Sequence, residues 1–206
     1  MKQEAPLHAL ASYLPEGTFD QVIAYITEYK VHLTITRERQ SVLGDYRHPY
    51  ENKGHRISIN GGLNKYSFLL TLLHEIAHLV TFIVYGNRVP AHGKEWKQEY
   101  GKILREFVGK QFLPPDVEAA VKQSLHNPAA SSCADEDLMR VLKNYDRRKE
   151  NHYHVEELPA GQLFKTKDGR MFRKGERIRK RFRCEEIPSK RVYLFSPVYE
   201  VEVVTE

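Results

Sequence analysis

The chain has 206 residues, of which 41% are hydrophobic and 29% are charged, and its formal net charge is +5. This composition is typical of a soluble protein with one ordinary domain and a smaller module. The two cysteines, Cys133 and Cys184, are too few for a disulfide framework and exclude a four-cysteine zinc site. The N-terminus lacks the apolar segment of a secretory signal, so we expect a cytoplasmic protein, and the positive charge slightly favours a polyanionic partner.

The first third of the chain predicts one helix followed by a small sheet. Apolar residues recur at helical spacing over residues 18–29, and Thr18 and Gln21 are placed for a capping box at the start. Alternating apolar and polar residues then predict three strands, at residues 31–36, about 40–47 and 56–60. We expect these strands to form an antiparallel sheet, and an edge strand of such a sheet can hold an extended peptide by backbone pairing.

The longest apolar run, from Phe68 to Tyr85, predicts a buried helix and contains the sequence His74-Glu-Ile-Ala-His78. Residues four apart lie on the same face of a helix, so these two imidazoles can bind one zinc ion. Glu75 neighbours the first imidazole and can reach a water molecule on the metal, take its proton as general base and pass it to a leaving amine. This pattern therefore indicates hydrolysis assisted by a metal ion.

Two other interpretations of this run are a metal-free helix with two hydrogen-bonded histidines and a membrane span. The motif is short and can occur by chance in a chain that has 10 histidines. A membrane span is disfavoured because two histidines and a glutamate lie near its midpoint and the chain has no second long apolar run. We therefore expect the core helix of a soluble domain.

A third histidine follows at the entrance to the next predicted helix. Gly86 and Pro90 end the first helix, and an amphipathic pattern predicts the second at about residues 94–108. The connection from His78 to His92 is long enough for the chain to turn back, so His92 can join the first two imidazoles. Three histidines leave the fourth tetrahedral position open to water, which is typical of a catalytic zinc site, whereas a structural site has four protein ligands.

The character of the chain changes after two short predicted helices, at about residues 117–125 and 135–146. The polar run from Asp146 to Asn151 is the best candidate for a domain boundary. Alternation beyond it predicts a β module of four or five strands, with a hairpin turning at Asp168-Gly169 within residues 163–172 and strands at 177–184, 191–195 and 198–204. The segment from Lys165 to Arg191 holds twelve Lys or Arg residues with aromatic residues between them, so it is a candidate contact for nucleic acid. The alternative is the solvated face of an ordinary small barrel.

The sequence His74-Glu-Ile-Ala-His78, followed by His92-Gly-Lys-Glu-Trp96, resembles the SprT-like family of metalloproteases. The run into the motif, with Gly44-Asp45-Tyr46 and His55-Arg-Ile-Ser-Ile-Asn60, is also similar to that family. The resemblance covers about residues 18–108, roughly half of the chain. Together these elements are far more specific than the five-residue motif alone.

The resemblance implies an α+β fold: a zincin-like metalloprotease domain with a small antiparallel sheet, followed by a small all-β module. The first domain would occupy residues 1–148, including a helical extension, and the basic β-strand module would occupy residues 149–206. Glu75 would be the catalytic acid and base. The zinc (Zn²⁺) ligands implied by the resemblance are His74, His78 and His92.

The resemblance also implies a zinc-dependent endopeptidase. Some family members cleave proteins crosslinked to DNA, so DNA-associated proteins are expected substrates. The rival function is a nucleic-acid-associated, transcription-related factor with a structural or vestigial zinc site. The chain departs from many family members because its C-terminal region holds only Cys184 in place of a four-cysteine zinc ribbon. We therefore expect no second zinc ion, and the basic segment Lys165 to Arg191 can take the ribbon's place as the DNA contact.

Overall fold

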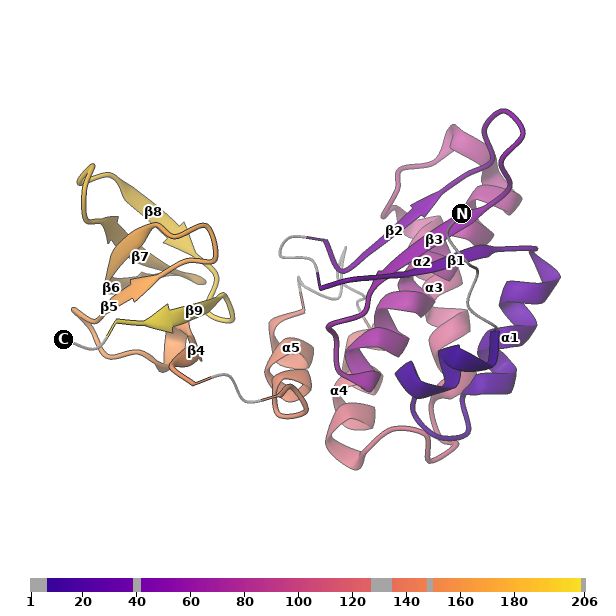
Figure 1. Ribbon diagram of the computed structural model, residues 1–206, viewed down its shortest axis with the longest axis horizontal. Helices are drawn as coiled ribbons and strands as arrows, with labels where there is room; N and C mark the ends of the chain where they lie inside the picture. The colour runs from indigo at the N-terminus through magenta and orange to yellow at the C-terminus, as the bar shows by residue number, and fades with distance from the viewer. Residues whose placement is uncertain (1–6, 39–41, 127–134, 148–149, 205–206) are drawn as a thin grey trace. The chain divides into compact units, whose positions relative to one another are not determined.

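Figure 1 shows a computed structural model of the chain, which describes residues 7–38, 42–126, 135–147 and 150–204. The chain forms two compact units, Met1–Asp146 and Arg147–Glu206. The predicted boundary between residues 148 and 149 lies outside the described residues, as does Cys133. The fold class is α+β, as predicted, because helices and a three-stranded sheet form the first unit and a six-stranded sheet forms the second.

The sheet of the first unit is mixed, so the prediction of an antiparallel sheet is wrong. Its strands are β1 (His32–Thr36), β2 (Gly44–Arg47) and β3 (Arg56–Asn60), in the spatial order β1-β3-β2. Strand β3 pairs antiparallel with β2 but parallel with β1. A short connection, such as the one between β2 and β3, favours an antiparallel pair. Strands β1 and β3 have no direct connection, because β2 lies between them in the sequence, and they run in the same direction. Strand β2 is therefore an edge strand of this sheet.

Helix α1 (Phe19–Glu28) lies where apolar periodicity predicts it, but the predicted capping box is wrong. The hydroxyl of Thr18 donates a hydrogen bond to the carbonyl oxygen of Pro15 at 2.8 Å and makes no side-chain cap. Thr18 already has helical backbone angles, and its side chain bonds back to the preceding turn instead of to the N–H groups of the helix. A short 3₁₀ helix, η1 (Leu7–Tyr13), precedes α1, and buried residues of both join the core.

Helix α2 (Lys65–Tyr85) is the central element of the first unit. Asn64 caps its start, because the side-chain oxygen accepts hydrogen bonds from the backbone N–H groups of Tyr66 at 3.0 Å and Ser67 at 2.9 Å. Gly86, whose φ is +62°, ends the helix as predicted. The helix is long and apolar enough to cross a membrane, but most of its length is buried inside the unit, which agrees with the prediction of a core helix.

Three further α-helices follow α2 in the first unit. They are α3 (Lys94–Phe107), α4 (Pro115–His126) and α5 (Glu136–Lys143), and a short 3₁₀ helix, η2 (Gly86–Arg88), follows α2. Helix α3 packs along α2, and its apolar face is buried. Helix α5 is tied to the start of α2, because the side-chain nitrogen of Asn64 donates a hydrogen bond to the carbonyl oxygen of Leu142 at 3.1 Å. These contacts fix the orientation of the helix that carries the motif.

The second unit is an antiparallel sheet in the order β4-β9-β5-β6-β7-β8. Its strands are β4 (His152–His154), β5 (Leu163–Lys165), β6 (Met171–Ile178), β7 (Arg181–Glu186), β8 (Val192–Phe195) and β9 (Glu200–Val203), with a 3₁₀ turn, η4 (Val155–Glu157), after β4. The predicted hairpin at Asp168-Gly169 is confirmed, and Gly169 has a φ of +86°. The unit has its own small core, which includes Phe164, Phe172 and Cys184.

The predicted single strand at residues 177–184 is wrong, because β6 ends at Ile178 and β7 begins at Arg181. The two residues between them make the hairpin turn, where Arg179 has a φ of +54°. The sequence did not reveal this turn because both turn residues are basic and neither is the Gly, Asn or Asp that such turns prefer. The described part of the second unit therefore has six strands, not four or five.

Candidate metal centre

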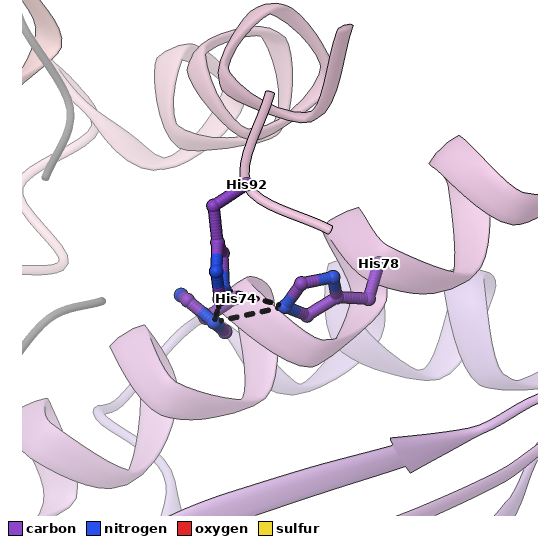
Figure 2. A group of neighbouring side chains, drawn as sticks. All are labelled: His74, His78 and His92. Carbon is purple, nitrogen blue, oxygen red and sulfur yellow. Dashed lines mark hydrogen bonds between the residues drawn. The ribbon is translucent and has the colours of Figure 1, made fainter. Parts of the chain in front are cut away.

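Three histidine side chains, from helix α2 and the loop that follows it, meet at one point (Figure 2). His74 and His78 lie one turn apart on α2, and His92 lies just before α3. The Nε2 atoms are separated by 3.1 Å between His74 and His78, 3.0 Å between His78 and His92, and 3.3 Å between His92 and His74. The structure therefore brings together the three histidines that the sequence singled out.

This arrangement fits a tetrahedral metal ion. Zinc binds imidazole nitrogens at about 2.0–2.1 Å, so two such ligands lie about 3.3–3.4 Å apart around the ion. The Nε2 separations of 3.0 to 3.3 Å are close to this value. A neutral imidazole has only one N–H, so three nitrogens that face one point cannot all be satisfied by one another, and a cation suits the position. Among the described residues, no other His, Cys, Asp or Glu joins the cluster.

Burial keeps the three imidazoles neutral. It lowers the pKa of His74 to about 3 and the pKa of His78 to about 4, and repulsion from the neighbouring imidazoles adds to both shifts. Burial also lowers the pKa of His92. Metal ions bind the neutral form of imidazole, so all three side chains have the protonation state that ligation requires at pH 7.

Trp96 forms an aromatic wall behind the histidines. Its ring is fully buried, and its centroid lies 4.7, 5.3 and 4.8 Å from the ring centroids of His74, His78 and His92. The ring also stacks on Tyr100 at 4.9 Å. The buried Nδ1 of His74 and Nε1 of Trp96 have no hydrogen-bond partner in the part of the chain that the structure describes, so packing orients both rings. Trp96 is the only tryptophan in the sequence, and its fluorescence should therefore respond to a metal ion bound at the centre.

Glu75 is buried next to His74, and strand β2 passes close to it at Gly44. A Cβ atom at Gly44 would lie 2.6 Å from Oε1 of Glu75 and 2.8 Å from Cγ2 of Thr71. Both distances are too short for real contacts, so the absence of a side chain at Gly44 lets the sheet approach the face of α2 that carries Glu75. The sequence singled out Gly44 only as part of the run into the motif.

We expect Gly44→Ala to displace Glu75 or β2 and to lower the free energy of unfolding by about 1–3 kcal/mol, because an added methyl group strains a packed contact. Metal binding should persist, since the atoms nearest to the new Cβ belong to Glu75 and Thr71 and not to the histidines. Urea denaturation and metal analysis measure the two effects. The matched control is Gly54→Ala, where a Cβ would meet nothing within 4 Å. Equal unfolding free energies for the two variants would contradict the close approach at Gly44.

A cavity of about 480 Å³ lies beside the three histidines. Strand β2, the second half of α2 and the loop residues 86, 87 and 89–92 line it, and Glu75 and the histidines form part of this lining. The histidine cluster is therefore accessible from the cavity. A catalytic metal site needs such access, because its fourth ligand position is taken by water or substrate.

The family model of the SprT-like family matches residues 12–122, which include the three-stranded sheet, α2, all three histidines and α3. The chain belongs to the SprT-like family. Members of this family are generally metal-dependent metalloproteases. No curated protein and no solved structure matches the chain significantly. The SprT-like match ends within α4 and leaves the second unit outside it.

The sequence prediction gave neither Phe82 nor Trp96 a role in the site, because Phe82 belonged to the apolar run and Trp96 only to the pattern that resembles the family. Phe82 lines the cavity, and Trp96 contacts every histidine of the cluster. Spacing was the available signal. Phe82 lies four residues after His78 and therefore on the same face of α2 as that histidine. Trp96 lies four residues after His92, in the first turn of α3, and can therefore lie on the same side as that histidine.

Proposed function

We propose that the first unit is a zinc-dependent endopeptidase with a zincin-like arrangement of its motif helix. The observation that carries the proposal is the convergence of three imidazole nitrogens next to a buried carboxylate, at the wall of a cavity that β2 also lines. Three neutral nitrogen ligands with one open position favour zinc over magnesium or calcium, which prefer oxygen ligands.

The residues of the site divide the chemistry between them. His74, His78 and His92 would hold the ion, which when bound supplies a Lewis acid for the attacking water and the scissile carbonyl. Glu75 follows His74 on α2 and lines the same cavity, where it accepts the proton of the water as general base. The same carboxyl group then returns the proton to the leaving amine as general acid.

The free edge of β2 offers a way to hold the substrate. The backbone N–H of Asn60 donates a hydrogen bond to the carbonyl oxygen of Leu43 at 2.8 Å, so this carbonyl points toward β3. Such bonds alternate along an antiparallel pair, and the backbone groups of Gly44 and Tyr46 therefore point toward the free edge. An extended peptide can pair with these groups whatever its sequence, which favours unfolded or flexible stretches of protein as substrates.

The rival function is a nucleic-acid-associated factor with a structural or vestigial zinc site. Structural zinc sites have four protein ligands, whereas this cluster has three within the described ranges and borders a cavity. Incubation of the zinc-loaded protein with an unfolded polypeptide separates the two functions. Cleavage that stops on chelation supports the endopeptidase, and bound zinc without any cleavage supports the rival.

We also propose that the second unit binds DNA through the tip of the β6–β7 hairpin, within the predicted basic segment Lys165 to Arg191. Four basic side chains elsewhere in this segment pair with acidic ones, which reduces the charge that they can offer to a phosphate. These pairs are Lys167–Glu200 at 3.1 Å, Arg170–Glu186 at 2.7 Å, Arg183–Glu176 at 3.8 Å and Lys190–Glu185 at 3.3 Å. At the tip, Arg177, Arg179, Lys180 and Arg181 are exposed, and no ion pair joins them to another described residue.

Replacement of Arg177, Arg179 and Arg181 by Gln is expected to weaken binding of single-stranded DNA and to reduce its salt dependence. Each phosphate contact contributes about 0.7 to the slope of log K against log salt for a single strand, so the slope should fall by about 2. Fluorescence anisotropy of a labelled oligonucleotide at several salt concentrations measures both quantities.

The matched control removes the same charge from paired residues, with Lys167, Arg183 and Lys190 replaced by Gln. This control should lose less affinity than the tip variant. Equal losses would contradict the assignment to the hairpin tip, and binding that does not depend on salt would contradict a phosphate contact of any kind.

A further inference from the structure

Aromatic side chains line part of the cavity beside the histidines. Phe82, on α2, is at their centre, and the ring of His48 stacks on it with a centroid distance of 5.0 Å and an interplanar angle of 7°. The rings of Tyr46 and His55 lie 6.4 and 6.1 Å from the same ring. Three of these residues line the cavity, and we call them the cavity wall: Tyr46, His48 and Phe82.

The cavity wall is held in place by the fold. Tyr46 lies opposite Ile57 in the β2–β3 pair, and Ile57 is buried, so the side chain of Tyr46 also faces α2. The Tyr46 hydroxyl lies 2.9 Å from Nδ1 of His55, within hydrogen-bond distance. Burial raises the pKa of Tyr46, so this hydroxyl stays protonated at neutral pH. Tyr46, on β2, and Phe82, on α2, are therefore in place before any ligand enters the cavity.

The centre of the cavity wall lies about one helix turn from the histidine cluster. Phe82 follows His78 by four residues, which is about 6 Å along a helix. An extended peptide advances about 3.3 Å per residue. If the peptide runs along β2 with its scissile bond at the histidines, a side chain next to that bond reaches Phe82.

The charges of the lining select against acidic side chains. No Lys or Arg among the described residues lines the cavity, and its two carboxylates belong to Asp45 and Glu75. Asp45 is already paired with Arg47 at 2.7 Å, so its charge is largely compensated toward a ligand of either sign. The carboxylate of Glu75 would repel an acidic side chain. A large apolar or aromatic side chain would make the most extensive contact with the aromatic rings.

We propose that the cavity wall is a specificity subsite that accepts a large apolar or aromatic side chain next to the scissile bond. The inference rests on the proposed endopeptidase function and narrows its substrate class to extended polypeptides with such a residue at a flanking position. The substrate side chain lies against the ring of Phe82, near His48 and Tyr46, and loses apolar surface to water when it binds.

Binding of two matched hydroxamates to the zinc-loaded protein tests the subsite without turnover. The compounds differ only in a benzyl or a methyl side chain next to the zinc-binding group, and calorimetry measures the two values of Kd. We expect the benzyl compound to bind at least about 10-fold more tightly, as burial of an aromatic ring implies. The Phe82→Ala variant should lose most of this difference and keep its zinc. The control is Ile83→Ala, because Ile83 is the next residue on α2, is 47% exposed and does not line the cavity.

Cleavage sites in an unfolded polypeptide, mapped by mass spectrometry, give a second readout. Wild-type sites should have a large apolar residue on one side of the cleaved bond, and Phe82→Ala should lose this preference. Equal binding of the two hydroxamates, or a preference that survives Phe82→Ala, would overturn the subsite and leave the endopeptidase in place. A side-chain preference in hydroxamate binding with no cleavage of any polypeptide would overturn the proposed function instead. Failure of both compounds to bind the zinc-loaded protein would overturn the open position on the zinc, and with it both the endopeptidase and the subsite.

Discussion

Glu75→Gln is expected to lower kcat/KM for peptide cleavage by about 10²–10⁴-fold, which is the contribution typical of a general base. Glutamine has nearly the same shape as glutamate and can keep the contact with Gly44, but its amide cannot accept the proton of the attacking water. Zinc content and the free energy of unfolding should remain those of the wild type. Initial rates on an internally quenched peptide at saturating zinc measure the change.

The matched control for this variant is Glu95→Gln. Glu95 lies in the first turn of α3, 3.8 Å from Lys94 and outside the cavity lining, so its loss should leave kcat/KM unchanged. A Glu75→Gln protein that cleaves the peptide at the wild-type rate would show that another group accepts the proton, and the assigned mechanism would be wrong.

His92→Ala is expected to abolish zinc binding at micromolar concentrations and to reduce cleavage to background. Removal of a residue that only supports a ligand costs about 10–100-fold in metal affinity, and loss of one of three ligands should cost more. His92 lies in the loop before α3 and is less buried than His74, so the variant should still fold. Zinc per chain after dialysis and the response of Trp96 fluorescence to added zinc measure the loss.

Zinc should also stabilise the wild-type protein by mass action, by about 4 kcal/mol when its free concentration is 1,000 times Kd. The same addition should leave the unfolding of His92→Ala nearly unchanged. His32→Ala, which removes an exposed histidine on β1, serves as the control and should behave like the wild type. Wild-type zinc content in His92→Ala would contradict the three-histidine centre.

Short-range spacing explains why much of the site could be predicted from the sequence. His74 and His78 lie one turn apart through helix geometry alone, and Gly86 ends α2 through a backbone angle that is local. The prediction for His92 needed one further condition, because the chain must return toward α2 before α3 begins. Gly86 and Pro90 end α2 and allow this return.

The features that the sequence did not predict depend on contacts between distant residues. The parallel pairing of β1 with β3 joins segments separated by a whole strand, and alternation in each strand is the same for either direction. The role of Gly44 appears only when β2 is placed against Glu75. The turn at Arg179 has a positive φ, which costs a non-glycine residue about 1–2 kcal/mol, and the pairing of β6 with β7 imposes it against local preference.

Zinc titration of the chelator-stripped wild-type protein, with cleavage of an internally quenched peptide as the readout, tests the zinc endopeptidase most directly. We predict no cleavage without zinc and activity that rises to a plateau at one zinc ion per chain, while Glu75→Gln stays near background at every concentration. Cleavage by the stripped protein at the full rate, or no cleavage at any zinc concentration, would contradict a catalytic zinc centre at His74, His78 and His92.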